Sequence, residues 1–364
     1  MSALEQAIFP NHPMRDSLLG VMIDNKWSDF YYTVNTYPAI KVSWEIVYIN
    51  EWIEKITPQD AETMAQSLMN AEQHKKLLET KNLDFSFEFR WSRFRWNISF
   101  QMWQYMTVLR LLSDKIPAIQ DMNLPFIYSE ITKLGQWLIL VTWPTWSGKS
   151  TTLAAMINEI NTNYAKHLIT IEDPIEYVHP HKKSIVEQKE IWKDVPDYHT
   201  ALIWAMRQNP QVILFWEMRS TEEIEMALTL AETWHLVFST LHTRSAYQTI
   251  SRIIDSFPAW QQNQVRLQLA DTLAWVFSQR LLRKQDWTWV KMVKEILIKN
   301  PAVSNLIREN ELHQLPSVMQ TSWKEWMQML EQDLLQYINE WEITLEEWLK
   351  YANNAKYLKD NVQL

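Results

Sequence analysis

A short run near the middle of the chain has the residue types and spacing needed to hold phosphate groups. The run Trp143-Pro-Thr-Trp-Ser-Gly-Lys-Ser-Thr151 follows the apolar segment 138–142 and precedes residues with helical periodicity. Gly148, Lys149 and Ser150 match the end of the pattern G-x-x-x-x-G-K-[ST]. In that pattern backbone N–H groups cradle phosphates, the lysine pairs with phosphate oxygens and the hydroxyl binds Mg²⁺. The sequence therefore predicts a loop that binds a nucleotide together with Mg²⁺.

The same loop carries two tryptophans at unusual positions. Trp143 occupies the first glycine position of the pattern, and Trp146 stands inside the loop. Glycine at the first position permits a positive φ or a close backbone approach, whereas an indole adds strain and fills ligand volume. Two alternatives stay open: a loop that binds nucleotide despite its indoles, and one that binds it poorly.

Acidic and histidine residues border three further apolar segments, at 168–171, 212–215 and 236–240. Glu172 and Glu217 follow the first two, whereas His242 follows the third and His235 precedes it. Ligands of parallel sheets bind at the carboxyl ends of the strands, where a carboxylate can hold Mg²⁺ or orient water. Taken singly, each residue is more often a solvated cap or a satisfied core residue. Three such segments after a phosphate-binding loop favour a functional site.

Short, continuous apolar segments are typical of strands buried on both faces of a sheet. Helical patterns separate them, and Ser220-Thr-Glu-Glu223 is a capping box that opens a helix through Ala231. The sequence thus predicts an α/β domain with a largely parallel sheet. Beyond Pro301 the pattern is mostly helical, and Thr344-Leu-Glu-Glu347 is expected to cap a last helix.

The first hundred residues favour a smaller α+β unit. Alternating or β-favouring residues predict antiparallel strands at 84–90, 94–100 and 106–110. A helix is expected to begin at Thr57-Pro-Gln-Asp60, with Met64, Leu68 and Ala71 on one face. The stretch 113–125 carries two prolines and fits neither periodicity, so we interpret it as a linker.

Composition narrows the class of protein. The 364 residues include only 3 glycines but 21 tryptophans, whereas ordinary usage predicts roughly 25 glycines. Tryptophan thus stands where glycine is expected. With no cysteine, the chain has no disulfide, thiolate nucleophile or cysteine zinc site. A net charge of −8 disfavours a broad nucleic-acid surface. Because the sequence has no apolar run of membrane-spanning length and its start lacks the signal-peptide pattern, neither a membrane span nor a signal peptide is expected.

These motifs, in this order, resemble the secretion-ATPase superfamily, and most closely the type IV pilus retraction ATPases of the PilT and PilU family. The four matching blocks are the Walker A motif 143–151, an Asp box at 169–179, an atypical Walker B motif at 213–219 and a His box at 231–242. Trp27-Ser-Asp29, Arg93-Phe-Arg95 and Asn97 fit the family's first domain. The segments 113–125, 179–188 and 278–281 are more similar to PilU than to PilT.

The resemblance implies an α/β architecture in four parts. These are an N-terminal PAS-like α+β domain (1–112), a linker (113–125), a RecA-like P-loop ATPase core (126–300) and a helical C-terminal region (301–364). It also implies a hexameric ATPase that hydrolyses ATP to power pilus retraction and twitching motility.

The family's functional residues carry over onto matching positions. Glu176 would be the general base or water-orienting carboxylate, and Glu217 the Walker B acid. Lys149 would act on the phosphates, while Arg93 and Arg95 would reach a neighbouring subunit's nucleotide. The implied nucleotide-binding residues are Pro144, Thr145, Ser147, Gly148, Lys149, Ser150, Thr151, Glu172, His235 and His242. Ser150 and Glu217 would hold Mg²⁺, so the implied cofactors are ATP and Mg²⁺.

The implied partners are five further copies of the chain, an inner-membrane pilus platform protein and, in one arrangement, a paralogous retraction ATPase. No nucleic acid is expected. The location would be cytoplasmic, peripheral at the inner-membrane base of the pilus machine. The family expects glycine where this chain has tryptophan at positions 27, 44, 143, 146, 216, 234 and 341.

Two alternatives remain open beside the retraction motor. One is a catalytically weak or inactive ring-forming partner of an active retraction ATPase, which the indoles of the phosphate-binding loop motivate. The other is a pilus assembly or type II secretion ATPase of the same superfamily. It is less favoured because we find neither the long N-terminal extension nor the four-cysteine zinc insert typical there.

Overall fold

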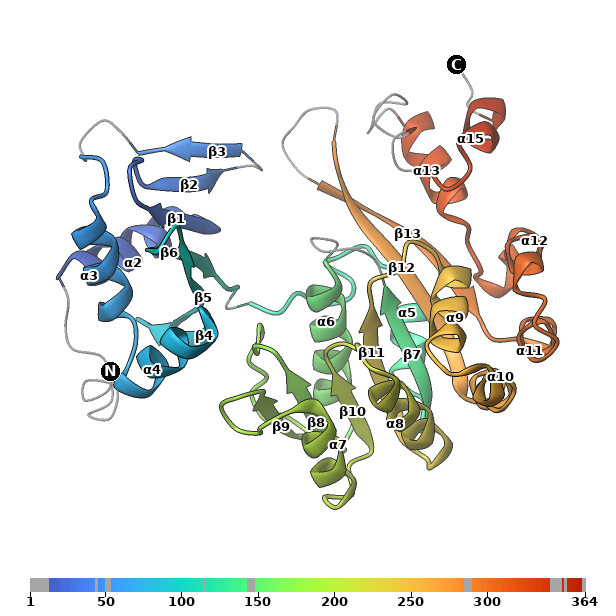
Figure 1. The fold of residues 1–364 in the computed structure, drawn as a ribbon. Coiled ribbons are helices and arrows are strands. Elements are labelled where there is room, and N and C mark those ends of the chain that lie inside the picture. The colour runs from blue at the N-terminus through green and yellow to red at the C-terminus, as the bar shows by residue number, and fades with distance from the viewer. Residues whose placement is uncertain are drawn as a thin grey trace. The chain divides into compact units, whose positions relative to one another are not determined.

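The computed structural model (Figure 1) describes residues 13–42, 45–49, 54–113, 115–142, 148–284, 290–340, 349 and 352–361. The chain forms two compact units. The N-terminal unit comprises Met1–Lys115 and Pro174–Val178, and the C-terminal unit comprises Ile116–Asp173 and His179–Leu364. In the described part of the chain, no helix has the length and apolar character needed to cross a membrane.

The N-terminal unit is built on an antiparallel sheet with strand order β3-β2-β1-β6-β5-β4. Its strands are β1 (Asp29–Thr33), β2 (Ala39–Val42), β3 (Glu45–Tyr48), β4 (Asn82–Phe89), β5 (Ser92–Gln101) and β6 (Gln104–Leu111). Along β5, Phe94 and Trp96 are buried, whereas Arg93, Arg95 and Asn97 between and beyond them are partly exposed. The three antiparallel strands predicted between residues 84 and 110 are confirmed.

The helices of this unit are α2 (Pro13–Asn25), α3 (Pro58–Ser67) and α4 (Ala71–Thr80). The expected helix start is confirmed, because Thr57 caps α3 in a reciprocal capping box with Asp60. The prediction that this helix continues to Ala71 is wrong. Asn70 opens a second capping box by accepting from the backbone N–H of Gln73 at 2.8 Å, so Ala71 begins α4.

In the described part of the C-terminal unit, one sheet has strand order β13-β12-β7-β11-β10-β8-β9. Its strands are β7 (Trp137–Thr142), β8 (His167–Glu172), β9 (Ile185–Glu190), β10 (Val212–Phe215), β11 (Leu236–Leu241), β12 (Leu273–Arg283) and β13 (Val290–Ile298). All neighbours pair in parallel except β12 and β13. The predicted parallel sheet is confirmed, although the sequence did not reveal the long β12–β13 pair.

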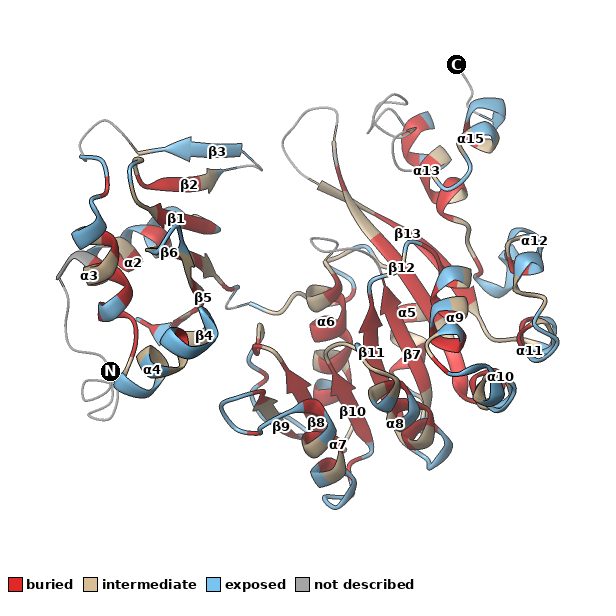
Figure 2. Ribbon diagram, viewed as in Figure 1, coloured by how far each residue is buried: buried red, intermediate tan, exposed pale blue. Residues whose placement is uncertain are grey.

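Alternate residues of the central strands enter two separate cores. Leu138 and Ile213 pack with helices on one face, and Ile139 and Val212 pack with helices on the other. The first face meets α7 (Tyr198–Met206), α8 (Thr221–Glu232), α9 (Ala246–Asp255), α10 (Ala259–Thr272), α11 (Pro301–Arg308) and α12 (Leu315–Thr321), and the second meets α5 (Ile127–Ile131) and α6 (Lys149–Asn163). Figure 2 shows the resulting burial of the central strands. Both faces of the sheet are covered, as the continuous apolar segments predicted.

The described part of the chain beyond Pro301 is mostly helical, as predicted. Besides α11 and α12 it contains short 3₁₀ turns at Leu312–Gln314 and Trp323–Glu325, then α13 (Leu330–Asn339) and α15 (Ala355–Asn361). Leu330, Leu334 and Leu358 pack against Leu282 and Val293 of the β12–β13 pair. The predicted cap at 344–347 lies outside the described residues.

Several tryptophans occupy backbone conformations that favour glycine. Among the described residues, those with positive φ are Trp91, Trp103, Trp137, Trp192, Trp234 and Trp326. Trp91 and Trp103 each end a two-residue hairpin connection in which both residues have positive φ, a setting where glycine is preferred. Trp216 is not among them, so at that position the structure shows no left-handed backbone.

Candidate active site

The first turn of α6 continues the predicted phosphate-binding loop. Gly148 precedes the helix with φ +79°, a conformation that strains residues with a side chain. Lys149 opens α6 and is 8% exposed, and Ser150 follows it in the same turn. The predicted site residues Pro144, Thr145 and Ser147, with Trp143 and Trp146, lie outside the described residues. The described end of the loop thus has the form of a phosphate-binding helix N-terminus.

Three predicted residues meet at the carboxyl edge of the parallel strands. The Lys149 Nζ lies 3.4 Å from His242 Nδ1, and His242 Nε2 lies 3.1 Å from Glu217 Oε1. These residues follow β7, β11 and β10, whose parallel pairing brings their carboxyl ends to one edge. Because an ammonium can only donate, Nδ1 accepts from Lys149 and the Nε2–H donates to Glu217. His242 therefore takes the Nε2–H tautomer in this arrangement.

The charge balance favours a neutral His242. Burial lowers the pKa of His242, the Lys149 charge lowers it further, and Glu217 opposes the shift. A second ring proton on Nδ1 would face the Lys149 ammonium, which explains the direction. At neutral pH the imidazole thus links a cation to a carboxylate without carrying a charge itself.

The arrangement extends to two residues that sequence reasoning did not single out. Arg219 Nε donates to Glu217 Oε2 at 2.8 Å, and Arg219 Nη1 lies 3.8 Å from Asp173 Oδ2. Asp173 directly follows β8, so the ends of β8, β10 and β11 all contribute. A basic residue two positions after the strand-end Glu217 was the available signal.

A family comparison matches residues 121–312 to "Type II/IV secretion system protein", a stretch covering more than half of the chain. The chain belongs to this family. Within the type II/IV secretion family, the twitching motility protein of Neisseria gonorrhoeae is 41% identical over 88% of this chain and 85% of its own length. The type IV pilus ATPase PilU of Pseudomonas aeruginosa is 34% identical over 96% of this chain and 91% of its own.

A solved structure gives the corresponding comparison of folds. The crystal structure of the pilus retraction motor PilT with bound ADP has a TM-score of 0.86 and 41% sequence identity, covering 95% of this chain and 98% of that one. The α/β fold with a RecA-like ATPase core is therefore confirmed, and the PilT and PilU relationship with it.

Glu172 and His235, which the family motifs also predicted for the site, do not take part in the contacts among Lys149, His242 and Glu217. Glu172 is 4% exposed, and its Oε1 accepts from the Thr170 hydroxyl at 2.7 Å and from Gln188 Nε2 at 3.2 Å. The Nδ1 of His235 lies 3.0 Å from the carbonyl oxygen of Leu230, at the C-terminal end of α8. Because His235 precedes β11 and His242 follows it, the two histidines lie at opposite ends of this strand. The structure does not bring His235 to Lys149.

The remaining predicted residues belong to the N-terminal unit. Arg93 donates to the Ser86 hydroxyl at 2.9 Å, and Arg95 forms an ion pair with Asp84 at 3.2 Å. Arg110 of β6 is paired in register with Arg95. Arg110 was not predicted, although the alternation of side chains along β6 places it on the same face of the sheet as Arg95.

Glu176 lies in Pro174–Val178, a segment that separates from the rest of the Asp box and belongs with the N-terminal unit. Its side chain is partly exposed. Among the described residues, no group of three or more His, Asp or Glu side chains is arranged to hold a metal ion.

Proposed function

We propose that this chain is a hexameric ATPase that hydrolyses ATP to power type IV pilus retraction and twitching motility. The observation that carries the proposal is the contact series from Lys149 through His242 to Glu217 at the carboxyl edge of the sheet. It joins a phosphate-binding helix start to a strand-end carboxylate, the pairing that phosphoryl-transfer sites require. Relatives named for twitching motility and pilus retraction, similar over most of their length, support the same function.

In this proposal each residue has a distinct task. The first turn of α6 and Lys149 would hold the phosphates, as the positive φ of Gly148 and the helix N-terminus allow. The Ser150 hydroxyl and the Glu217 carboxylate supply oxygen donors, which suit Mg²⁺. The metal would neutralise phosphate charge when bound. Glu176 would orient the attacking water, completing hydrolysis.

The ring assembly rests on the arginines of the N-terminal unit. Arg93 and Arg95 lie on the partly exposed face of β5, with Phe94 buried between them. An arginine supplied by a neighbouring subunit would stabilise charge developing on the transferred phosphate. We accordingly propose a homo-hexamer, working at the cytoplasmic face of the inner membrane on a pilus platform protein, alone or with a paralogous ATPase. The PilU-like role and the four-part domain division belong to the same proposal.

The tryptophans of the phosphate-binding loop support a second candidate. Trp143 and Trp146 replace glycines in the Walker A motif, so this chain would be a ring-forming partner with weak or no turnover. The assembly or type II secretion alternative gains less support, because the twitching motility protein and PilU match this chain over 85% and 91% of their own lengths.

The deciding experiment is Mg²⁺-dependent ATP hydrolysis by the purified full chain, by Lys149→Ala and by Trp143→Gly/Trp146→Gly. The motor function predicts turnover that falls about 100-fold or more in Lys149→Ala. Turnover by the double glycine variant alone would identify this chain as the inactive partner. No turnover by either, with both folded and assembled, would contradict the motor function for this chain.

A further inference from the structure

Arg219 contacts the ends of two neighbouring strands at once. Its Nε donates to Glu217 Oε2 at 2.8 Å, and its Nη1 lies 3.8 Å from Asp173 Oδ2. The Glu217 side chain is 15% exposed and that of Arg219 is 56% exposed. The arginine therefore covers the carboxylate from the solvent side.

The backbone of Arg219 is itself held in place. Its N–H donates to Glu223 Oε2 at 2.6 Å, and the N–H of Ser220 donates to the same oxygen at 3.0 Å. Glu223 and Ser220 also form the capping box that opens α8. The backbone that carries the guanidinium is therefore fixed at the start of α8. In most exposed ion pairs, by contrast, holding two long side chains in one geometry costs entropy.

Both oxygens of Glu217 are engaged by different partners. Arg219 holds Oε2, while Oε1 accepts from Nε2 of His242 at 3.1 Å. A charged N–H fixed on one carboxylate oxygen restricts the rotation of the group and so sets the direction of the other oxygen. The orientation of His242, whose Nδ1 faces Lys149, depends in turn on that oxygen.

We propose that Arg219 is a positioning residue of the hydrolytic site. It holds Glu217 so that Oε1 accepts from His242, and this contact keeps His242 Nδ1 directed at Lys149. The proposal deepens the proposed ATPase function and rests on it. A surface ion pair with no such role would contribute little to stability and nothing to turnover.

The test compares Arg219→Gln, Arg219→Lys and Arg244→Gln. Arg244 is an exposed arginine two residues after His242, and the described residues offer it no ion-pair partner, so its replacement controls for loss of one positive charge. Arg219→Gln is expected to lower kcat about 10- to 100-fold, as loss of an outer positioning contact commonly does. The Kd for ADP should change less than about twofold, because the hydrogen bonds and ion pairs of Arg219 in the described part of the chain are with Glu217, Asp173 and Glu223 and not with the first turn of α6, which would hold the phosphates. Arg219→Lys should recover part of kcat, since an ammonium can still reach one carboxylate oxygen.

The tautomer of His242, followed by ¹⁵N NMR of the full chain, gives a readout independent of turnover. The reference chain should show the Nε2–H tautomer, and Arg219→Gln should mix the two tautomers, while Arg244→Gln should not. The proposal is overturned if Arg219→Gln keeps the Nε2–H tautomer and reference kcat. It is also overturned if kcat and ADP affinity fall together, or if Arg244→Gln behaves alike. Should the unmodified chain itself not hydrolyse ATP, the motor function fails for this chain, and the tautomer alone decides the role of Arg219.

Discussion

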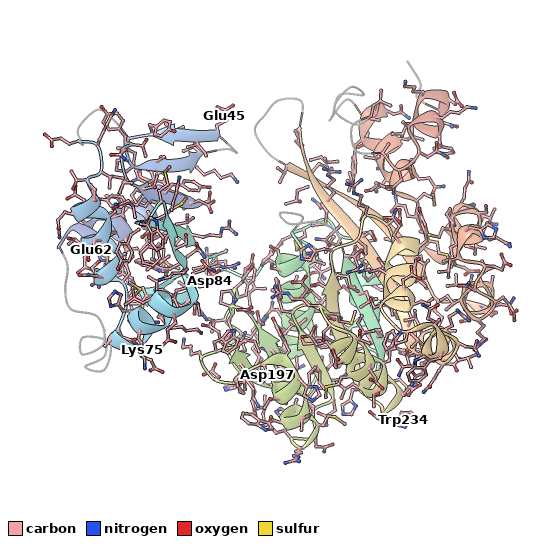
Figure 3. All side chains as sticks on the ribbon, viewed as in Figure 1. Glu45, Glu62, Lys75, Asp84, Asp197 and Trp234 are labelled. Atoms are coloured by element: carbon pink, nitrogen blue, oxygen red, sulfur yellow. The ribbon has the colours of Figure 1, made fainter. Side chains whose placement is uncertain are left out.

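Trp234→Gly is expected to stabilise the C-terminal unit, although it removes the largest side chain. Trp234 directly follows the C-cap of α8 and has φ +68°. The N–H of His235 donates to the carbonyl oxygen of Leu230 at 3.2 Å, which is the 6→1 hydrogen bond of a Schellman motif. The left-handed position of that motif is usually glycine. Figure 3 labels Trp234 at the end of α8, where it is 79% exposed.

The expected change in the free energy of unfolding on Trp234→Gly is the sum of three effects. A left-handed conformation costs an L-residue roughly 1–2 kcal/mol. Glycine returns about 0.5–1 kcal/mol of this through the larger entropy of its unfolded state. Because most of the Trp234 ring is in solvent, its removal exposes little apolar surface. The net gain is about 0.5–1 kcal/mol, equivalent to a rise in Tm of roughly 2 °C for a unit of this size.

Trp260→Gly is the matched control, because Trp260 is 78% exposed but lies in α10 with a negative φ. Glycine lowers helix propensity there, so this variant should lose up to about 0.5 kcal/mol. Urea unfolding of the full chain, followed by far-UV circular dichroism, measures both. The reasoning is refuted if Trp234→Gly lowers the midpoint, or if the two variants shift it in the same direction.

Two further predictions concern buried charges near the C-terminal helices. Burial raises the pKa of Glu295 to about 7, and the Glu331 charge adds to the rise, so folding favours the protonated form. The stability that protonated Glu295 contributes is complete below pH 4.5 and is lost as the pH rises through about 7. Glu295→Gln should therefore remove about 3 kcal/mol of the pH dependence of the free energy of unfolding, measured in unfolding titrations between pH 5 and 8. The Lys294 Nζ lies 3.0 Å from Asp333 Oδ1, and both residues are buried. Asp333→Ala should therefore cost about 3–5 kcal/mol in the same assay, and Lys294→Met/Asp333→Leu much less, because no charge then stays unpaired.

Local sequence signals predicted helix starts better than helix ends. The N-cap predicted at Thr57 and the capping box predicted at Ser220 both open helices in the structure, and the structure adds that Thr57 and Asp60 also form a capping box. The end of α3 depended on Asn70, whose cap competes with a continued helix, and the apolar spacing through Ala71 concealed it. The start of β12 was hidden for a related reason: Leu273 follows Thr272, the last residue of α10, with no glycine or proline between them.

The candidate site was predictable where sheet topology alone brings residues together. Lys149, Glu217 and His242 each follow a parallel strand, so their proximity follows from strand order. His235 has the same chemistry but stands before its strand, and a motif match does not register that difference. The role proposed for Arg219 depends on the contacts of its guanidinium with Glu217 and Asp173, which sequence spacing alone does not specify.

Two sets of tryptophans in this chain have separate consequences. Trp91, Trp103, Trp192 and Trp234 lie in hairpin connections, a turn and a helix end, and each is more than half exposed. Their strain of roughly 1–2 kcal/mol apiece acts on folding and leaves the contacts among Lys149, His242 and Glu217 in place. By sequence, Trp143 and Trp146 fall in the Walker A motif, so under the proposed function they would affect nucleotide binding and turnover instead. Glycine at the exposed positions should thus raise the free energy of unfolding and leave kcat unchanged. Glycine at positions 143 and 146 should instead have its main effect on kcat.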